Sequence, residues 1–115
     1  MPNIKFVKYN GIRFKCVRNR EIGTRMFMNF FDNARKEHTG KEIEGHIILD
    51  STINLQESIV LTFWRTKEEM DKFYSFKNTA LANLVESAMP LFEGMPKRAD
   101  YAVSETSFRK SKSCQ

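Results

Sequence analysis

The sequence contains few cysteines and histidines, and it has no long hydrophobic run. Its cysteines are Cys16 and Cys114, and its histidines are His38 and His46. Two cysteines do not build a disulfide framework, and neither histidine has a partner at a spacing typical of metal ligands. No apolar stretch reaches the roughly 18 residues of a membrane helix, and the N-terminus lacks the apolar core of a signal peptide. We therefore predict a cytoplasmic protein with free thiols, no metal and no membrane partner.

The chain is basic, with a formal net charge of +5 and a pI of about 9.4. A basic surface attracts nucleic acid or anionic ligands, but no nucleic-acid-binding motif accompanies this charge. We expect a solvated basic face and no nucleic-acid partner. Because 41% of the 115 residues are hydrophobic, one domain with an ordinary core is expected. We place it over residues 1–108 and predict a basic, flexible tail over residues 109–115.

A strand followed by a helix-start signal lies in the middle of the sequence. No charged residue occurs from Val60 to Trp64, which is typical of a strand covered on both faces. Thr66 and Glu69 then have the spacing of a capping box, which satisfies backbone N–H groups of a first helical turn. We predict a strand over residues 58–64 and a helix ending at about Tyr74.

The remaining elements follow from periodicity and turn residues. Asn10-Gly11 is typical of a turn, so residues 1–11 would form an extra strand before a second strand over residues 12–18. A helix is predicted from Thr24 to residues 38–40, although its start could be as early as Arg20. We further predict a strand over 42–50, a connection with a bulge at Asn54, a helix over 79–94 and a last strand over 99–108.

This order of elements is β-α-β-β-α-β, which is typical of an α+β ferredoxin-like fold with helices on one face of an antiparallel sheet. The uncharged central strand requires a cover on the other face, because an open apolar face of that size is unfavourable in water. A second copy of the same sheet supplies such a cover. We therefore expect a two-fold homodimer that associates through the sheet face.

Two stretches resemble the antibiotic biosynthesis monooxygenase superfamily, whose members form dimeric α/β barrels. They are residues 59–74, with the sequence IVLTFWRTKEEMDKFY, and residues 90–96, PLFEGMP, which lead into residues 100–103. The resemblance implies a homodimer. It also implies that the protein needs no cofactor, because some members oxidise aromatic polyketides or quinols with O₂ and without metal or flavin. Related haem-degrading members carry a histidine on the helix after the tryptophan, and this sequence has no histidine after His46.

The resemblance also implies a site beside Trp64, which is similar to the strand-end tryptophan that lines the pocket in those enzymes. Trp64 would stack on a substrate, and Tyr74 would donate a hydrogen bond to it. Phe73 and Tyr101 would line the pocket. The alternative is that these four aromatic residues belong to the core or to a dimer interface.

Arg13 and Lys15 share one face of a predicted central strand, where two buried cations are costly unless they are paired. Three interpretations remain open. The cations pair across the sheet with Glu42, Glu44 or Asp50, they point to solvent near an edge, or they bind an anionic ligand. His46, on its predicted strand, is either a general base or a hydrogen-bonded structural residue.

Two main functions follow from these observations, and a basic accessory protein that contacts nucleic acid is a third, less favoured hypothesis. The first is a cofactor-independent monooxygenase that acts on a small aromatic or quinol-type molecule in a pocket beside Trp64. The second is a non-enzymatic dimeric module with a basic surface that binds a small apolar or anionic ligand. A solvent-accessible pocket with a polar group directed into it is required by both.

Overall fold

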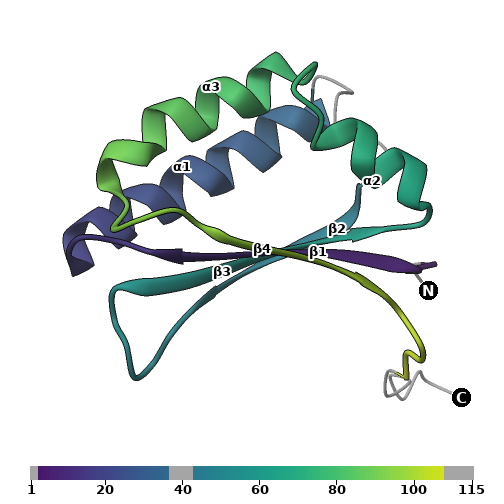
Figure 1. The fold of residues 1–115 in the computed structure, drawn as a ribbon, viewed down its shortest axis with the longest axis horizontal. Helices are drawn as coiled ribbons and strands as arrows, with labels where there is room; N and C mark the ends of the chain where they lie inside the picture. The colour runs from purple at the N-terminus through teal and green to yellow at the C-terminus, as the bar shows by residue number, and fades with distance from the viewer. Residues whose placement is uncertain (1–2, 37–42, 108–115) are drawn as a thin grey trace, which may run out of the picture.

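Three helices cover one face of a four-stranded sheet in the computed structural model, which describes residues 3–36 and 43–107 (Figure 1). The predicted ferredoxin-like α+β fold is confirmed. The elements are β1 (Phe6–Arg13), α1 (Val17–Lys36), β2 (Ile43–Asp50), β3 (Glu57–Trp64), α2 (Lys67–Phe73), α3 (Thr79–Ala88), the 3₁₀ turn η1 (Met89–Leu91) and β4 (Lys97–Ala102).

The strands lie in the order β2-β3-β1-β4, and every neighbouring pair is antiparallel. The predicted β2–β3 hairpin is confirmed. The bulge predicted at Asn54 is wrong, because the register of this pair shifts instead between Ile43 and Gly45. Tyr9 at the centre of the sheet lies opposite Leu61 on one side and Ala99 on the other.

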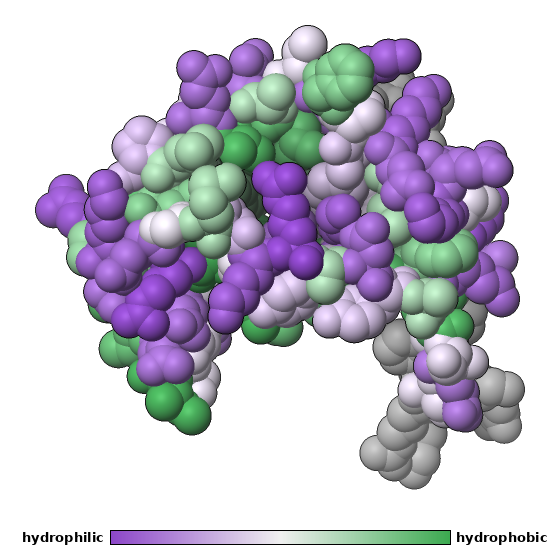
Figure 2. Space-filling view, in the orientation of Figure 1, coloured by the Kyte–Doolittle hydropathy of each residue, from purple (hydrophilic) through white to green (hydrophobic). Residues whose placement is uncertain are grey.

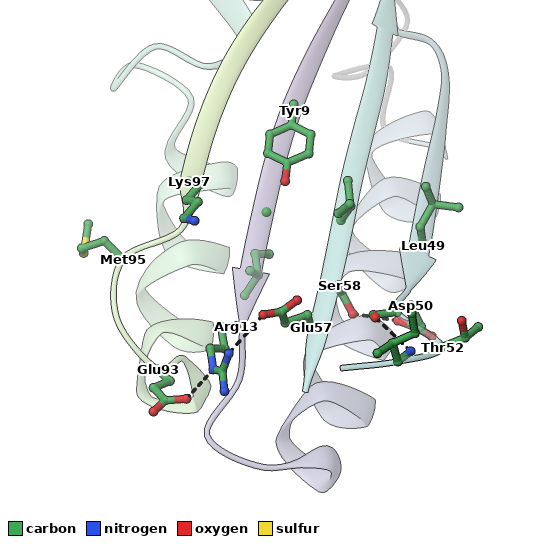
Figure 3. A pocket seen from close by; sticks show the side chains of 15 residues that line it. Tyr9, Arg13, Leu49, Asp50, Thr52, Glu57, Ser58, Glu93, Met95 and Lys97 are labelled. Atoms are coloured by element: carbon green, nitrogen blue, oxygen red, sulfur yellow. Dashed lines mark hydrogen bonds and ion pairs between the residues drawn. The ribbon is translucent and has the colours of Figure 1, made fainter. Parts of the chain in front are cut away.

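Strand β1 runs without interruption through Asn10-Gly11, so the predicted turn and the extra strand before it are wrong. The reason lies in the Tyr9 side chain, which lies along the strand (Figure 3) with its hydroxyl group close to Gly11. A Cβ atom at Gly11 would stand 2.5 Å from the Tyr9 hydroxyl oxygen. The glycine thus provides space for the ring and does not mark a turn.

Helix α1 begins at Val17, whereas the sequence predicts its start at Thr24 with a loop before it. Gly23 suggests a loop in the sequence, but in the structure it is buried inside the helix. A Cβ atom there would overlap the ring of Phe14, so glycine allows helix and strand to approach closely. The predicted end of this helix, at residues 38–40, lies outside the described residues.

The start signals of the later helices are present as side-chain caps. Thr66 accepts a hydrogen bond from the Glu69 backbone N–H at 3.1 Å, which confirms the predicted N-cap of α2. Asn78 caps α3 by accepting from the Leu81 N–H at 3.2 Å. Gly94, with φ of 82°, precedes β4. This strand starts two residues earlier than predicted and ends at Ala102.

The two faces of the sheet differ in cover. Side chains at alternate positions of β3, from Ser58 to Trp64, are buried beneath the helices. Those at the intervening positions are half-buried and face away from the helices, where no other described element of the chain covers them. On this open face Ile47 and Leu49 of β2 are 44% and 46% exposed. The second cover expected for the central strand is therefore not supplied by this part of the chain.

Candidate functional site

A cavity of about 430 Å³ lies between helix α3 and the β1–β4 half of the sheet; we call it the α3 cavity. Figure 2 shows hydrophobic side chains along α3 and around a hollow beneath it. Polar side chains among its lining residues come mainly from the sheet and from the segment after α2. The described lining comprises Asn10, Ile12, Phe27, Phe31, Val60, Tyr74, Ser75, Phe76, Leu81, Ala82, Leu84, Val85, Glu86, Met89, Phe92, Pro96 and Arg98.

The cavity exists because α3 contacts the core mainly at its C-terminal end. Ala88 is the one buried residue of α3, while Leu84 and Val85 are only partly buried. The angle between α2 and α3 is fixed by Asn78. Its side-chain amide donates to the Phe73 carbonyl oxygen at 2.9 Å, and its side-chain oxygen accepts from the Leu81 N–H. The apolar side chains of α3 thus border a space that they do not fill.

A short chain of hydrogen bonds ends at Tyr74, a residue that lines the α3 cavity. The Trp64 Nε1–H donates to Thr62 Oγ1 at 2.9 Å, and Thr62 Oγ1 lies 2.8 Å from Tyr74 Oη. Trp64 and Thr62 are fully buried. A hydroxyl group has one hydrogen and two acceptor sites, and the indole uses one of those sites. If Thr62 donates its hydrogen to Tyr74, the Tyr74 hydroxyl keeps its own hydrogen for a group in the cavity.

The Tyr74 hydroxyl is neutral at physiological pH. Burial raises the pKa of Tyr74 to about 12, although the hydrogen bond with Thr62 acts in the opposite direction. The ammonium nitrogen of Lys8 lies 5.0 Å from the centre of the Tyr74 ring and forms an ion pair with Asp100 at 2.7 Å. Tyr74 is therefore suited to donating a hydrogen bond and unsuited to accepting a proton as a base.

Two polar side chains from neighbouring strands form the sheet wall of the cavity. Asn10 of β1 lies directly opposite Arg98 of β4, and both residues line the cavity. Neither side chain has a hydrogen bond or ion pair with any residue in the ranges 3–36 and 43–107. Residues opposite each other in an antiparallel pair lie on the same face of the sheet, so these groups are neighbours.

The structure brings some of the predicted site residues together and separates others. Phe73, the last residue of α2, packs on Trp64 of β3 with ring centroids 5.2 Å apart, and neither is among the described residues lining the α3 cavity. Tyr74 does line it. Tyr101 lies opposite Val7 on the open face of the sheet and is 57% exposed. Tyr101 is therefore separated from Tyr74 by the thickness of the sheet.

Arg13 is the last residue of β1, and Lys15 follows the strand. Both side chains are exposed. Arg13 forms ion pairs with Glu57 at 3.1 Å and with Glu93 at 2.8 Å (Figure 3). These carboxylates, chiefly Glu93, raise the pKa of Arg13. Lys15 is exposed, and its backbone N–H donates to the Leu91 carbonyl oxygen. The exposure of Arg13 and Lys15 agrees with the interpretation that they point to solvent, and it arises because β1 ends at Arg13.

The partners predicted for these cations bind other residues. Glu44 pairs with Arg65 at 2.7 Å and Asp50 pairs with Arg20 at 2.8 Å, while residue 42 lies outside the described ranges. Asp50 also accepts a hydrogen bond from Ser58 at 2.7 Å. Asp50 and Ser58 line a second hollow of about 630 Å³ on the open face of the sheet, shown in Figure 3.

His46 lies on β2 and its ring stacks on Phe31 with centroids 4.4 Å apart. Its Nδ1 atom is buried without a hydrogen-bond partner among the described residues. Burial lowers the pKa of His46, and the nearby Arg35 adds to this effect. His46 is not among the described residues that line the α3 cavity. The described ranges also contain no cluster of three or more His, Cys, Asp or Glu side chains suited to a metal.

Comparison with known proteins gives a clear result for structure and none for sequence. No known family profile and no curated protein matches the sequence. A dimeric ferredoxin-like protein from an uncultured marine organism superposes with a TM-score of 0.77 at 11% identity, covering 93% of this chain and 94% of that one. A second structure is that of a monooxygenase of Streptomyces coelicolor from the gene ActVA-Orf6, solved in complex with nanaomycin D. It superposes with a TM-score of 0.70 at 12% identity, covering 96% of both chains.

A candidate antibiotic biosynthesis monooxygenase from Chloroflexus aurantiacus gives a TM-score of 0.68 at 7% identity, covering 90% of this chain and 96% of that one. The chain therefore shares its ferredoxin-like fold with these proteins, two of which are described as monooxygenases. Identities this low establish the fold alone, because this fold and other common folds host unrelated activities. Within the described ranges, no helix is long and apolar enough to cross a membrane.

Proposed function

We propose that the α3 cavity binds a small aromatic molecule and that the protein is a cofactor-independent monooxygenase of phenols or quinols. The observation that carries this proposal is that Tyr74, whose neutral hydroxyl belongs to a buried hydrogen-bond chain, is one of the residues lining a mainly apolar cavity. The monooxygenase fold and the solved complex of one structural neighbour with nanaomycin D support it.

The chemistry balances with O₂ as the sole co-reactant. A phenol with a free para position forms a carbon–oxygen bond there, loses its para hydrogen and its hydroxyl hydrogen, and becomes the para-quinone. The O–O bond breaks, one oxygen atom enters the product, and the other leaves as water. All four electrons come from the phenol. The protein must therefore hold the phenol in a dry cavity and favour its ionised form.

Tyr74 is suited to that task. A hydrogen bond donated to the phenol oxygen stabilises the phenolate more than the phenol, which lowers the pKa of the bound substrate. Trp64 acts in this proposal through Thr62, which it fixes by hydrogen bonding, and not by stacking on the substrate. Phe73 supports the Trp64 ring from the end of α2. Tyr101, Arg13 and Lys15 are left out, because they lie on other surfaces.

The proposal is tested by measuring oxygen uptake with α-naphthol and related hydroxylated aromatics. We expect uptake and quinone formation with the wild-type protein, and a decrease of about tenfold or more in Tyr74→Phe. Tyr101→Phe is a matched control, because it removes the same hydroxyl on the opposite face of the sheet. Equal rates in the wild type and Tyr74→Phe would contradict the assignment of Tyr74.

A second candidate, a non-enzymatic module that binds an aromatic ligand, is favoured by a different observation. The described lining of the α3 cavity contains no histidine or cysteine, so no side chain there ordinarily titrates close to neutral pH. Saturable binding of aromatics without oxygen uptake above the buffer rate would support this candidate against the first.

We also propose a homodimer that associates through the open face of the sheet, in the cytoplasm that the sequence predicts. Ile59, Leu61 and Phe63 of β3 lie on this face, and a neighbour of the same fold is described as dimeric. The β2–β3 turn bends away from the helices (Figure 1), and it carries Ile53 and Leu55, which are 86% and 53% exposed. A partner sheet would cover this apolar surface.

Sedimentation of purified protein tests the dimer. We expect the wild type to sediment as a dimer and Leu61→Glu as a monomer, because a carboxylate would be buried in the interface. Met28→Glu is the matched control, since Met28 lies on α1 and is 50% exposed. A wild-type monomer at tens of micromolar, or a dimer of Leu61→Glu, would contradict the proposal.

A further inference from the structure

We infer that the α3 cavity selects aromatic ligands that carry an anionic oxygen group, such as a carboxylate or a sulfonate, and that Arg98 and Asn10 bind this group. The inference rests on the proposed function, because it assigns the ligand class of the same cavity. It concerns a different wall from that of Tyr74, so the two ends of the ligand would be held separately.

The first support is the position of the two side chains. Arg98 and Asn10 form a directly opposed pair on β4 and β1, and the neighbouring positions Gly11 and Lys97 lie on the other face of the sheet. A guanidinium fork and a side-chain amide side by side offer several N–H donors. Within the described part of the chain these donors have no acceptor, although they border a mainly apolar cavity.

The second support is the balance of charge on this wall. The next opposed pair on the same face of these two strands, Lys8 and Asp100, forms an ion pair at 2.7 Å, so those charges compensate each other. Arg98 has no such partner among the described residues. The charge of Arg98 lowers the pKa of Tyr74, against the larger opposing effects of burial and of Asp100. An anion entering the cavity therefore meets a positive charge at the sheet that has no ion-pair partner among the described residues.

The opposite wall gives the ligand an orientation. Glu86 on α3 also lines the cavity, and it has no ion pair with a described residue. A carboxylate there repels an anion near α3, while Arg98 attracts it toward the sheet. The anionic group is thereby directed to β1 and β4, and the aromatic body lies among apolar side chains such as Ile12, Val60 and Val85.

Arg98 is exposed, so the effect of its charge is moderate. An exposed ion pair changes affinity by a small factor, and a charge-assisted hydrogen bond from a fork adds to it. We expect removal of the charge to weaken binding of an anionic aromatic by about fivefold. Binding of the anion should also weaken with added salt, whereas binding of a neutral analogue should not.

Two fluorescent probes with the same aromatic framework test the inference. Anilinonaphthalene sulfonate carries an anionic group and phenylnaphthylamine does not, and both become brighter in an apolar cavity. Each is titrated into the wild type, Arg98→Gln, Arg98→Lys and Lys97→Gln. Lys97→Gln is the matched control, because it removes one positive charge from the same strand on the opposite face. Val85→Trp, which places a large ring in the cavity, shows whether the probes bind there.

The expected result is a loss of about fivefold in sulfonate affinity for Arg98→Gln, little change for Arg98→Lys, and no change for the neutral probe or for Lys97→Gln. Equal weakening in Arg98→Gln and Lys97→Gln, or no weakening in either, overturns the inference while the neutral probe still binds. If neither probe binds the wild type, or if Val85→Trp leaves neutral-probe binding intact, the proposed aromatic site fails and the inference fails with it.

Discussion

Beneath α2 the helix and the sheet are in full contact, whereas beneath α3 a cavity separates them. Trp64 and Met70 are fully buried at this contact, and Phe73 is 6% exposed. Of the ten residues in α3, only Ala88 is buried. The same sheet therefore supports one densely packed region and one open region, joined by the short segment that Asn78 fixes.

The difference separates the residues that hold the fold from those that border a ligand. The dense region fixes Thr62 and Tyr74 in place, because Trp64 cannot move without leaving a void. The open region provides the volume. Tyr74 lies at the boundary, with its ring 6.1 Å from the Trp64 ring and its edge on the α3 cavity. A site of this kind combines rigid support with space for a ligand.

The largest expected effect comes from truncating each region in turn. Trp64→Ala should lower the free energy of unfolding by about 3–5 kcal/mol, because it leaves a cavity in a packed core. Val85→Ala should cost about 1 kcal/mol or less, since Val85 already borders open space. Urea unfolding followed by circular dichroism measures both. Similar losses in the two variants would show that the regions are packed alike.

A smaller effect is expected where the two regions meet. Thr62→Val removes the hydroxyl that accepts from the Trp64 Nε1–H and leaves this buried donor without a partner. A loss of about 1–3 kcal/mol in the free energy of unfolding follows. Thr62→Ser keeps the hydroxyl and is the matched control. The emission of Trp64, the one tryptophan in the sequence, reports the change. An unchanged stability and emission in Thr62→Val would mean that the hydrogen bond contributes nothing.

The smallest expected effect lies away from both regions, between α1 and β2. Because the folded protein has a lowered pKa for His46, the neutral form is favoured by folding. This contribution is present above about pH 6.5 and is lost as the pH falls through the lower pKa of the folded state. The melting temperature should therefore decrease more between about pH 7 and pH 5 in the wild type than in His46→Gln. His38→Gln controls for the other histidine, and equal decreases in all three proteins would refute the role of His46.

Much of this fold could be predicted from the sequence, because its strongest signals are local. Thr66 and Glu69 predict the start of α2, and the uncharged run of residues before them predicts β3. Two of the errors occur at Gly11 and Gly23, where the residue type is explained by the ring of another residue. Tyr9 and Phe14 require space that only glycine leaves. Such contacts depend on the assembled fold and have no local signal.

The candidate site was predictable only in part. Tyr74 is proposed through the resemblance, but no local pattern in the sequence indicates that Trp64 is sealed from the cavity. Asn10 and Arg98 were missed because Asn10-Gly11 was interpreted as a turn. If β1 is predicted to continue through Asn10-Gly11, the alternation of side chains along the strand places Asn10 on the face of the sheet that the helices cover. Its pairing with Arg98 depends on the register with β4, which the sequence does not state.

The central place of β1 also affects how the chain folds as it is synthesised. β1 is the first described strand, yet it lies in the sheet between β3 and β4, which come from the middle and the end of the described chain. The edge of β1 that pairs with β4 therefore stays unpaired until β4 has left the ribosome and completes the sheet. Pairing between distant segments is slow, and unpaired strand edges are prone to association. A nascent chain that stalls before β4 would expose this edge together with an α3 cavity that still lacks its Arg98 wall.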